Sequence, residues 1–504
     1  MNIKCISLLF HTLILPELFF GICVLYLVLH CLFFGYNRNN SLFLVEKSMT
    51  FLIILIILMT CTLLINQNFF DSKILTFNNN FASDILSNVA KITIGIISII
   101  FFFALRHFIG IKKANSFEYY IIFLLALLGT FLICTANDLL TAYLSIELQS
   151  LSFYLLASFH KNSTYSVESG LKYFILGSFS SGLFLYGSSI LYGLFGTLNF
   201  TDFFDLTEDF EGSNILCPDV FQYPLFIILI SLLFKLAVAP FHIWLPDIYE
   251  GSLFSSSFFF AVVPKLSIFI LFFKLFNHCF FNLTFYLTDY LVFIAVFSVI
   301  VGSFAGLEQR KLKSLLAYSS ISHMGYVLMV FNLPNNEGLS LGLSYIIVYM
   351  ISGTCFWMIL QLAAVKSVYK KKQNKDLIDL VLIQKSNLGL AVSLNVVLFS
   401  FAGFPPFIGF LVKIGLFLAA IEMSYYLVSF LSIFCSVVST FYYIRVVKVI
   451  YFETVLIGKL YYPINVQTTT VLVAIVYSLL FFFIRPNLLF YISYKASLVI
   501  FEHF

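Results

Sequence analysis

Charged side chains are scarce in this chain of 504 residues: they make up only 10% of it, whereas hydrophobic residues make up 61%. A soluble domain has roughly 25% charged and about 45–50% apolar residues, so this balance excludes a soluble globular protein. The apolar content suffices for about 14–15 membrane helices of about 20 residues each. The composition therefore predicts an all-α protein that crosses a membrane many times.

Paired cysteines and nucleotide-binding motifs are also missing. The nine cysteines are scattered through the chain and form no C-x-x-C pair, so neither a disulfide framework nor an iron–sulfur or zinc site is indicated. The sequence contains no Rossmann glycine fingerprint, phosphate loop or basic–aromatic surface for nucleic acid. We therefore expect this chain to hold no metal, nicotinamide or flavin, and to have no nucleic-acid partner.

Fourteen apolar runs are long enough to cross a membrane. We predict one membrane domain over residues 1–504. It comprises three spans in 1–109, five in 117–276, five in 286–451, and a last span with a short amphipathic tail in 467–504. The predicted spans are approximately 6–34, 49–65, 88–109, 117–136, 139–159, 167–195, 223–243, 253–276, 286–306, 314–331, 339–366, 387–420, 424–451 and 467–485.

The positions of the basic residues support this number of spans. Of the 28 lysines and arginines, four lie within spans and 18 fall on one side of the membrane. A missed or additional helix in mid-chain would remove this asymmetry, and both termini are predicted on the less basic side. That side holds only six basic residues, which are Lys4, Lys73, Lys91, Lys274, Arg485 and Lys495.

Five charged residues lie within the predicted spans: Glu147, Lys172, Lys235, Lys265 and Lys413. A charge at the centre of a bilayer costs at least ~2.5–3.5 kcal/mol, so each is a candidate functional residue. At 1.5 Å per residue, Glu147 lies about 13 Å into its span, and Lys235 and Lys265 lie about 18 Å into theirs. Lys172 lies closer to the start of its span, so its side chain could reach the interface.

Other charges are expected to be structural. Asp247 and Glu250 follow the seventh span without an evident partner, and we expect them to cap helices. Four basic residues within two turns of span ends are expected to anchor the chain at the membrane interface, namely Lys91, Arg106, Lys274 and Arg445.

Two spans contain prolines near their lysine. Pro240 follows Lys235 by five residues, and Pro405 and Pro406 precede Lys413. Proline removes a backbone donor, and membrane helices broken in this way line polar cavities. A simple proline kink is the alternative. The broken spans are the seventh and the twelfth, and an offset of five reverses the direction of a span, so spans 4–8 and 9–13 are predicted to be inverted repeats.

Polar side chains gather in the tenth predicted span, SLLAYSSISHMGYV. Histidine titrates near neutral pH, so His323 could relay protons through water held by the neighbouring serines. Small polar residues equally stabilise contacts between membrane helices. The sequence leaves both roles open for His323.

The intramembrane charges are sufficient for a proton wire. A carboxylate beside a lysine stabilises the charged form of each, and a conformational change that separates them favours release of the lysine proton. Glu147 and Lys235 would form this switch, with Lys265 as the central relay and Lys413 as the exit.

Five segments between about residues 117 and 450 carry a family resemblance: TAYLSIELQSLSFYLLAS, GLKYFILGSFSSGLFLYGSSILYG, FKLAVAPFHIWLPDIYEGS, KLKSLLAYSSISHMGYV and FAGFPPFIGFLVKIG. In order and spacing they resemble chain N (chain 2 in mitochondria) of NADH:quinone oxidoreductase, respiratory complex I, a family of antiporter-like membrane subunits. The resemblance implies fourteen helices with inverted repeats. It also implies proton-transfer roles for Glu147, Lys235, Lys265 and Lys413, with Lys172 modulating the first pair. One departure is EGSLFSSSF, where the family usually reads EGSPTPV.

The resemblance further implies one subunit of a large assembly. NADH, flavin, iron–sulfur clusters and ubiquinone would be bound by other subunits, and this chain would contact other membrane-arm subunits and lipids. The abundance of Phe (64) and Tyr (29) is typical of an A+T-rich organellar gene, which favours the mitochondrial inner membrane. A free-standing cation/proton antiporter with the same lysines is the alternative, and a subunit that no longer conducts is a third possibility.

Overall fold

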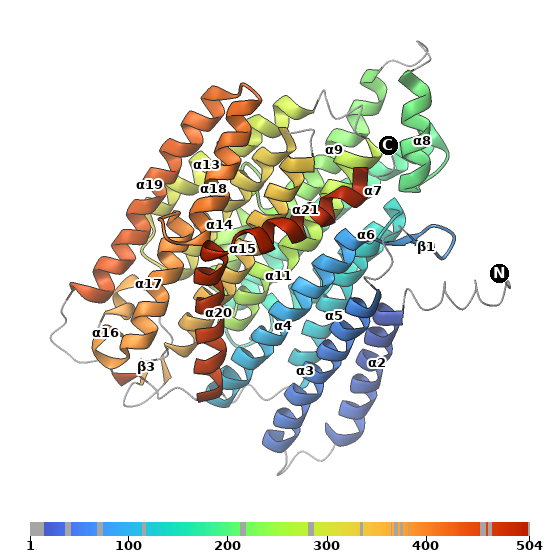
Figure 1. The fold of residues 1–504 in the computed structure, drawn as a ribbon. Helices are drawn as coiled ribbons and strands as arrows, with labels where there is room; N and C mark the ends of the chain where they lie inside the picture. Colours follow the sequence, from blue (N-terminus) through green and yellow to red (C-terminus); the bar gives the residue numbers. More distant parts are fainter. Residues whose placement is uncertain are drawn as a thin grey trace.

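The computed structural model describes residues 15–35, 42–67, 74–112, 117–211, 218–280, 287–332, 336–363, 365–366, 371–372, 376–381, 383–453, 460–461 and 466–501. Most of these residues are helical (Figure 1). Residues 6–14 of the first predicted span, and Lys4 and Lys73 of the predicted less basic side, lie outside the described residues.

The helices follow one another in the predicted order. The first three spans are α2 (Leu15–Gly35), α3 (Leu42–Gln67) and α4 (Ile85–Lys112), with an antiparallel hairpin of β1 (Ile74–Thr76) and β2 (Phe81–Ser83) between α3 and α4. The first repeat contains α5 (Phe117–Thr135), α6 (Leu139–Ala157), α7 (Thr164–Phe195), the broken pair α9 (Pro218–Leu236) and α10 (Trp244–Gly251), and α11 (Phe254–Phe273) with the π-helix η1 (Lys274–Cys279). A separate helix, α8 (Phe200–Glu211), lies between α7 and α9 in the chain.

The second repeat has the same sequence of elements. It contains α13 (Thr288–Glu308), α14 (Leu312–Leu328) with η2 (Met329–Asn332), α15 (Asn336–Leu362), the broken pair α17 (Leu388–Ala402) and α18 (Ile408–Glu422), and α19 (Tyr426–Tyr451). Short elements precede α17 or lie beyond α19: β3 (Val365–Lys366), β4 (Lys371–Lys372), η3 (Leu377–Leu380), α16 (Ile383–Ser386) and β5 (Leu460–Tyr461). The chain continues with α20 (Val466–Ile484) and α21 (Asn487–Phe501).

The predicted number of spans is confirmed. Among the described residues, 11 helices are long and apolar enough to cross a membrane, and three shorter apolar helices lie within α2, α9 and α17. These helices correspond one by one to the fourteen predicted spans. The chain is therefore an all-α membrane protein that crosses the membrane many times.

The two repeats share one packing scheme. In the first, α5 packs on α6 and α11, and α7 packs on α6 and α9. In the second, the equivalent helix α13 packs on α14 and α19, and α15 packs on α14 and α17. Because corresponding helices are five spans apart, they run in opposite directions, as predicted for inverted repeats.

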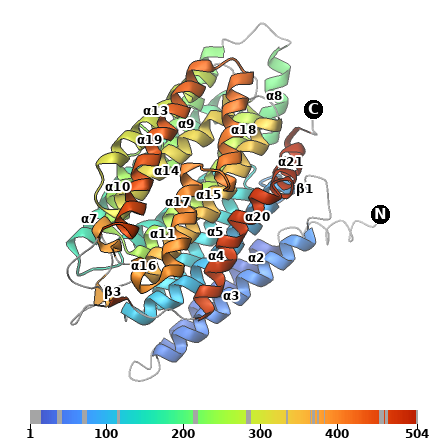
Figure 2. The same cartoon turned by 60° about the vertical axis from the view of Figure 1, so that its left-hand side comes forward.

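One helix of the first repeat lies at the centre of the bundle. Every residue of α11 is buried, and it contacts α4, α5, α6, α9 and α15. Figures 1 and 2 show α2 and α3 on one flank of the molecule and α19 on the opposite flank. The last helix, α21, turns away from α20 and packs on α15 and α4 (Figure 1). The central position of α11 brings its lysine, Lys265, between the two repeats.

Candidate functional site

The first broken helix ends one residue after Lys235. Ala237 adopts a left-handed φ of 57°, and its amide donates to the carbonyl oxygen of Phe234 at 3.0 Å. The indole N–H of Trp244, at the start of α10, donates to the same oxygen at 3.1 Å. The break therefore places Lys235 at the carboxyl end of a half-helix, where the helix dipole favours a positive charge.

The ammonium group of Lys235 is enclosed, and among the described residues it has no hydrogen-bond partner. The carboxylate of Glu147, on α6, is within Coulombic reach of this ammonium without contacting it as an ion pair. Ser150 donates to Glu147 Oε2 at 3.2 Å. The predicted switch residues are thus neighbours whose charged groups do not touch in this conformation.

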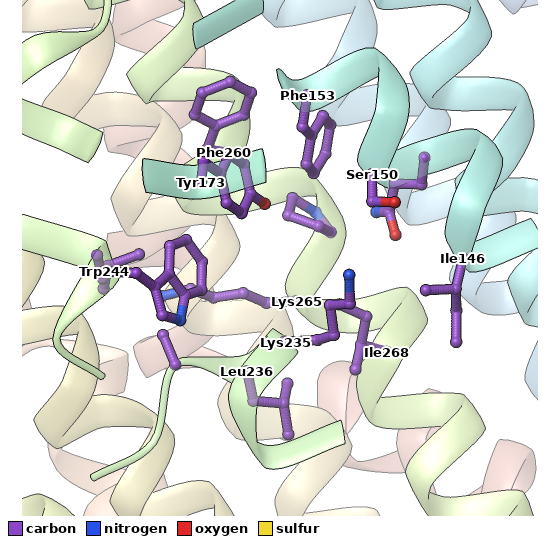
Figure 3. Close-up of a pocket in the computed structure, with 14 residues that line it drawn as sticks. Ile146, Ser150, Phe153, Tyr173, Lys235, Leu236, Trp244, Phe260, Lys265 and Ile268 are labelled. Carbon is purple, nitrogen blue, oxygen red and sulfur yellow. The ribbon is translucent and has the colours of Figure 1, made fainter. Parts of the chain in front are cut away.

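Lys235 and Lys265 line the same cavity, which we call the first cavity (Figure 3). Trp244 and Tyr173 lie on one side of it, and Ile146 and Ser150 of α6 lie on the other. The volume open to the centre of a water molecule is ≈ 20 Å³. One ordered water needs about 10–15 Å³ by this measure, so the cavity can hold a water between the lysines.

Lys265 is buried in the middle of α11, with 3% of its surface exposed. Its ammonium group donates a hydrogen bond to the hydroxyl of Tyr349 on α15 at 2.9 Å. This contact joins the first repeat to the second.

Tyr349 also lines a second cavity of ≈ 20 Å³ by the same measure. His323 of α14 and Lys413 of α18 lie in the wall of this second cavity, together with Tyr345. The ring nitrogens of His323 are held by two tyrosines: Nδ1 lies 2.7 Å from the Tyr345 hydroxyl, and Nε2 lies 3.3 Å from that of Tyr443. The histidine is therefore part of a polar chain, in addition to packing between helices.

The second broken helix binds its lysine directly. α17 ends at Ala402, and the next residue, Gly403, has a φ of 83°. Lys413 donates to the carbonyl oxygens of Phe401 at 2.8 Å and Ala402 at 3.1 Å. A Cβ atom on Gly403 would lie 2.9 Å from Lys413 Cδ. The carbonyl groups freed by the break are thus satisfied by the lysine of the other half-helix.

Lys172 lies apart from these buried lysines. Nearly half of its side chain is exposed, and its ammonium nitrogen lies 2.9 Å from carboxylate oxygens of both Glu168 and Asp247. Glu250 likewise pairs with Lys311, and this hydrogen bond raises the pKa of Lys311. The prediction that Asp247 and Glu250 lack partners is therefore wrong, because α7 and α14 bring basic residues beside α10.

Two of the four predicted interfacial anchors are exposed, as expected: Arg106 and Arg445. The other two are buried, so that prediction is wrong for them. Lys91 Nζ lies 2.6 Å from Glu17 Oε1 on α2, and neither side chain reaches the surface appreciably. Lys274 donates to the carbonyl oxygen of Cys134 at 2.8 Å and lies 3.8 Å from Asp84. Position near a span end did not reveal them because neighbouring helices cover these ends.

Tyr345 and Tyr349 were not among the functional residues predicted from the sequence. Tyr345 and Tyr349 are four residues apart, so they project from one face of α15, and that spacing in an apolar helix is the signal that could have found them. The described residues contain no group of three or more His, Cys, Asp or Glu that could hold a metal ion. The chemistry available at this site is proton transfer among ammonium, hydroxyl, imidazole and carboxylate groups.

Inverted repeats with a lysine at each helix break, joined by buried polar groups, define an antiporter-like membrane protein. Comparison with known proteins identifies its family. The family model described as NADH:quinone oxidoreductase/Mrp antiporter, TM, matches residues 136–439. The chain belongs to this family.

Among curated relatives, NADH-ubiquinone oxidoreductase chain 2 of Marchantia polymorpha is 37% identical over 392 residues, covering 77% of this chain and 78% of the relative. The chain 2 of Arabidopsis thaliana is 32% identical over 491 residues, covering 96% of each. NADH-quinone oxidoreductase subunit N of Pelagibacter ubique is 34% identical over 441 residues, covering 87% of this chain and 89% of the relative. The similarity therefore extends beyond the helices matched by the family model.

Solved structures share the fold. A chain of respiratory complex I from Thermus thermophilus with bound aureothin superposes with a TM-score of 0.78 at 24% identity, covering 94% of this chain and 98% of its own length. A chain of the Mrp complex from Dietzia sp. has a TM-score of 0.81 at 17% identity, with 97% of each chain covered.

Proposed function

We propose that this chain is an antiporter-like membrane subunit of NADH:quinone oxidoreductase that moves protons along its buried lysines. The observation that carries the proposal is the sequence of shared cavities and contacts. Lys235 and Lys265 share the first cavity, and Lys265 donates to Tyr349. Tyr349 in turn lines the second cavity with Lys413.

Glu147 and Lys235 act as the switch in this proposal. Lys235 has no hydrogen-bond partner among the described residues, and Glu147 is close enough to influence its charge. A movement that brings the carboxylate nearer favours the protonated lysine, and a movement apart favours release of its proton towards Lys265. Lys413 then receives the proton as the exit group. Lys172, tied to Asp247 beside the first break, adjusts the switch from outside.

Electron transfer takes place elsewhere in the assembly under this proposal. Other subunits bind NADH, flavin, iron–sulfur clusters and ubiquinone, and this chain contacts membrane-arm subunits and lipids. The ubiquinone-linked plant relatives and the organellar composition support placement in the mitochondrial inner membrane.

The test is Glu147→Gln in the assembled complex, because glutamine keeps the shape of the side chain and removes its charge. We expect fewer protons translocated per NADH oxidised, measured as NADH-driven acidification of sealed vesicles. A native gel with an in-gel NADH stain reports assembly. Glu118→Gln, at an exposed acid in the first turn of α5, is the matched control and should leave the ratio unchanged. An unchanged ratio in a fully assembled Glu147→Gln complex would contradict the proposal.

A free-standing cation/proton antiporter is the second candidate, and the shared fold with the Mrp complex chain is the observation that favours it. It predicts that the isolated chain in liposomes exchanges sodium for protons and migrates alone on a native gel. Comigration with an NADH-oxidising assembly and no exchange by the isolated chain supports the complex I assignment.

A further inference from the structure

The two water-sized cavities are separate, and each contains a different part of the lysine series. Lys235 and Lys265 line the first cavity, and Lys413 lines the second. No lining residue is shared between them. A proton that passes from Lys265 to Lys413 must therefore cross the wall between the cavities.

Tyr349 occupies that wall. Its hydroxyl accepts the hydrogen bond from Lys265 at 2.9 Å, and the residue itself lines the second cavity. Both partners are buried, with 3% of Lys265 and 7% of Tyr349 exposed. The ring of Tyr349 lies 5.3 Å from that of His323, within the same polar cluster. Among the described residues, Tyr349 is the one side chain bonded to a lysine of the first cavity that also borders the second.

We propose that Tyr349 is a catalytic residue that carries protons from Lys265 to the second cavity. The proposal rests on the proposed function and assigns a residue to the step between the two repeats. As the Lys265 N–H bond breaks, a bond from that proton to the Tyr349 oxygen forms. The original hydroxyl proton leaves to one water molecule in the second cavity. Tyr349 ends with one proton, as it began, and never carries a net charge.

Lys413 is the group that receives the proton from this water. Both ring nitrogens of His323 lie within hydrogen-bonding distance of tyrosine hydroxyls, at 2.7 and 3.3 Å, so the histidine orients the cluster. In its neutral form Lys413 offers a lone pair, and as it gains a proton its ammonium group is stabilised by the carbonyl oxygens of Phe401 and Ala402. The net result is one proton lost by Lys265 and one gained by Lys413, with the water regenerated.

The test is Tyr349→Phe in the assembled complex, because phenylalanine keeps the ring and its packing and removes only the hydroxyl. We expect the number of protons translocated per NADH to fall by the same fraction as in Lys265→Met. Tyr119→Phe is the matched control. Tyr119 is also buried, and its hydroxyl lies 2.6 Å from Ser255 Oγ, but among the described residues it has no hydrogen bond to a lysine. This control should keep the wild-type ratio.

The Lys265→Met arm separates failure of this inference from failure of the proposed function. If Lys265→Met lowers the ratio and Tyr349→Phe does not, the hydroxyl is not the link and the inference is overturned. If Lys265→Met itself leaves the ratio unchanged, the proposed function fails.

A further variant distinguishes proton transfer from packing. Tyr349→His restores a group that can accept and donate a proton, so we expect it to recover at least half of the ratio lost in Tyr349→Phe. If Tyr349→Phe does not assemble, Tyr349→His alone decides the question. A ratio as low as that of Lys265→Met in an assembled Tyr349→His complex would overturn the inference.

Discussion

The lysines of the two broken helices, Lys235 and Lys413, differ in their hydrogen bonding. At the first break, Lys235 has no hydrogen-bond partner among the described residues, and the indole of Trp244 takes the carbonyl oxygen of Phe234. At the second break, Lys413 itself donates to the carbonyl oxygens of Phe401 and Ala402. Lys235 can therefore respond to the carboxylate of Glu147, whereas Lys413 is held by the dipoles of two backbone carbonyl groups.

The position of each lysine relative to its helix break explains this difference. Lys413 follows its break, so its ammonium group can reach back to the carbonyl groups at the end of the preceding half-helix. Lys235 precedes its break and lies on the half-helix whose end is open, so its ammonium group cannot reach those carbonyl groups. Counting from Pro240 and Pro406, the seventh residue is Asp247 in the first repeat and Lys413 in the second. The carboxylate of Asp247 pairs with Lys172 near the surface, and 53% of the Asp247 side chain is exposed. Under the proposed function, inverted repeats of the same architecture would provide a switch in one half and a fixed acceptor in the other.

The largest expected effect on stability is Lys413→Met. It leaves two buried carbonyl groups without their donor, at about 1–3 kcal/mol each, so we expect a loss of about 2–6 kcal/mol. Among the described residues Lys235 has no hydrogen-bond partner, so Lys235→Met should cost less than about 1 kcal/mol. The thermal-denaturation midpoints of the two purified variants measure the difference. Equal losses in both would remove the contrast between the breaks.

The next largest expected effect on stability comes from the two residues with a left-handed φ at the breaks. Gly403→Ala introduces a side chain at a φ of 83° and crowds Lys413 Cδ, so we expect a loss of about 1–2 kcal/mol. Ala237→Gly, at a φ of 57°, relieves the same kind of strain at the first break and should raise stability by less than about 1 kcal/mol. Changes of the same sign in the two unfolding midpoints would contradict this account.

Trp244→Phe tests how the first break is closed. It removes the indole donor to Phe234, a bond worth about 0.5–1.5 kcal/mol. The amide of Ala237 still donates to the same oxygen, so we expect a loss near the lower end of that range. A midpoint shift as large as that of Lys413→Met would show that the indole, and not the lysine arrangement, distinguishes the two breaks.

The smallest effect concerns the exposed pair of Glu250, on α10, and Lys311, which directly precedes α14. Glu250 raises the pKa of Lys311, so the pair stabilises the fold below about pH 10.4 and this contribution is lost as pH rises through the higher folded-state pKa. Because both side chains are about half exposed, solvent limits the contribution to about 0–1 kcal/mol. Comparing unfolding midpoints between pH 8 and 12 should show a steeper decline for the wild type than for Glu250→Gln. Identical profiles would mean that the pair adds nothing.

The sequence was sufficient for features that depend on neighbouring residues. The apolar runs predicted the fourteen spans, and Pro240 and Pro406 marked the two breaks, because a missing backbone donor acts locally. The partners of the lysines depend on helix packing and were not predictable. Tyr349 is 84 positions from Lys265, and Glu17 is 74 positions from Lys91. Composition alone cannot tell which of many tyrosines or acids will face a given lysine.

We propose that Lys235 takes part in proton transfer and contributes little to the stability of the fold. The most direct measurement is the number of protons translocated per NADH oxidised by an assembled complex that carries Lys235→Met. We expect normal assembly and a lowered ratio. A wild-type ratio in a fully assembled complex would contradict it.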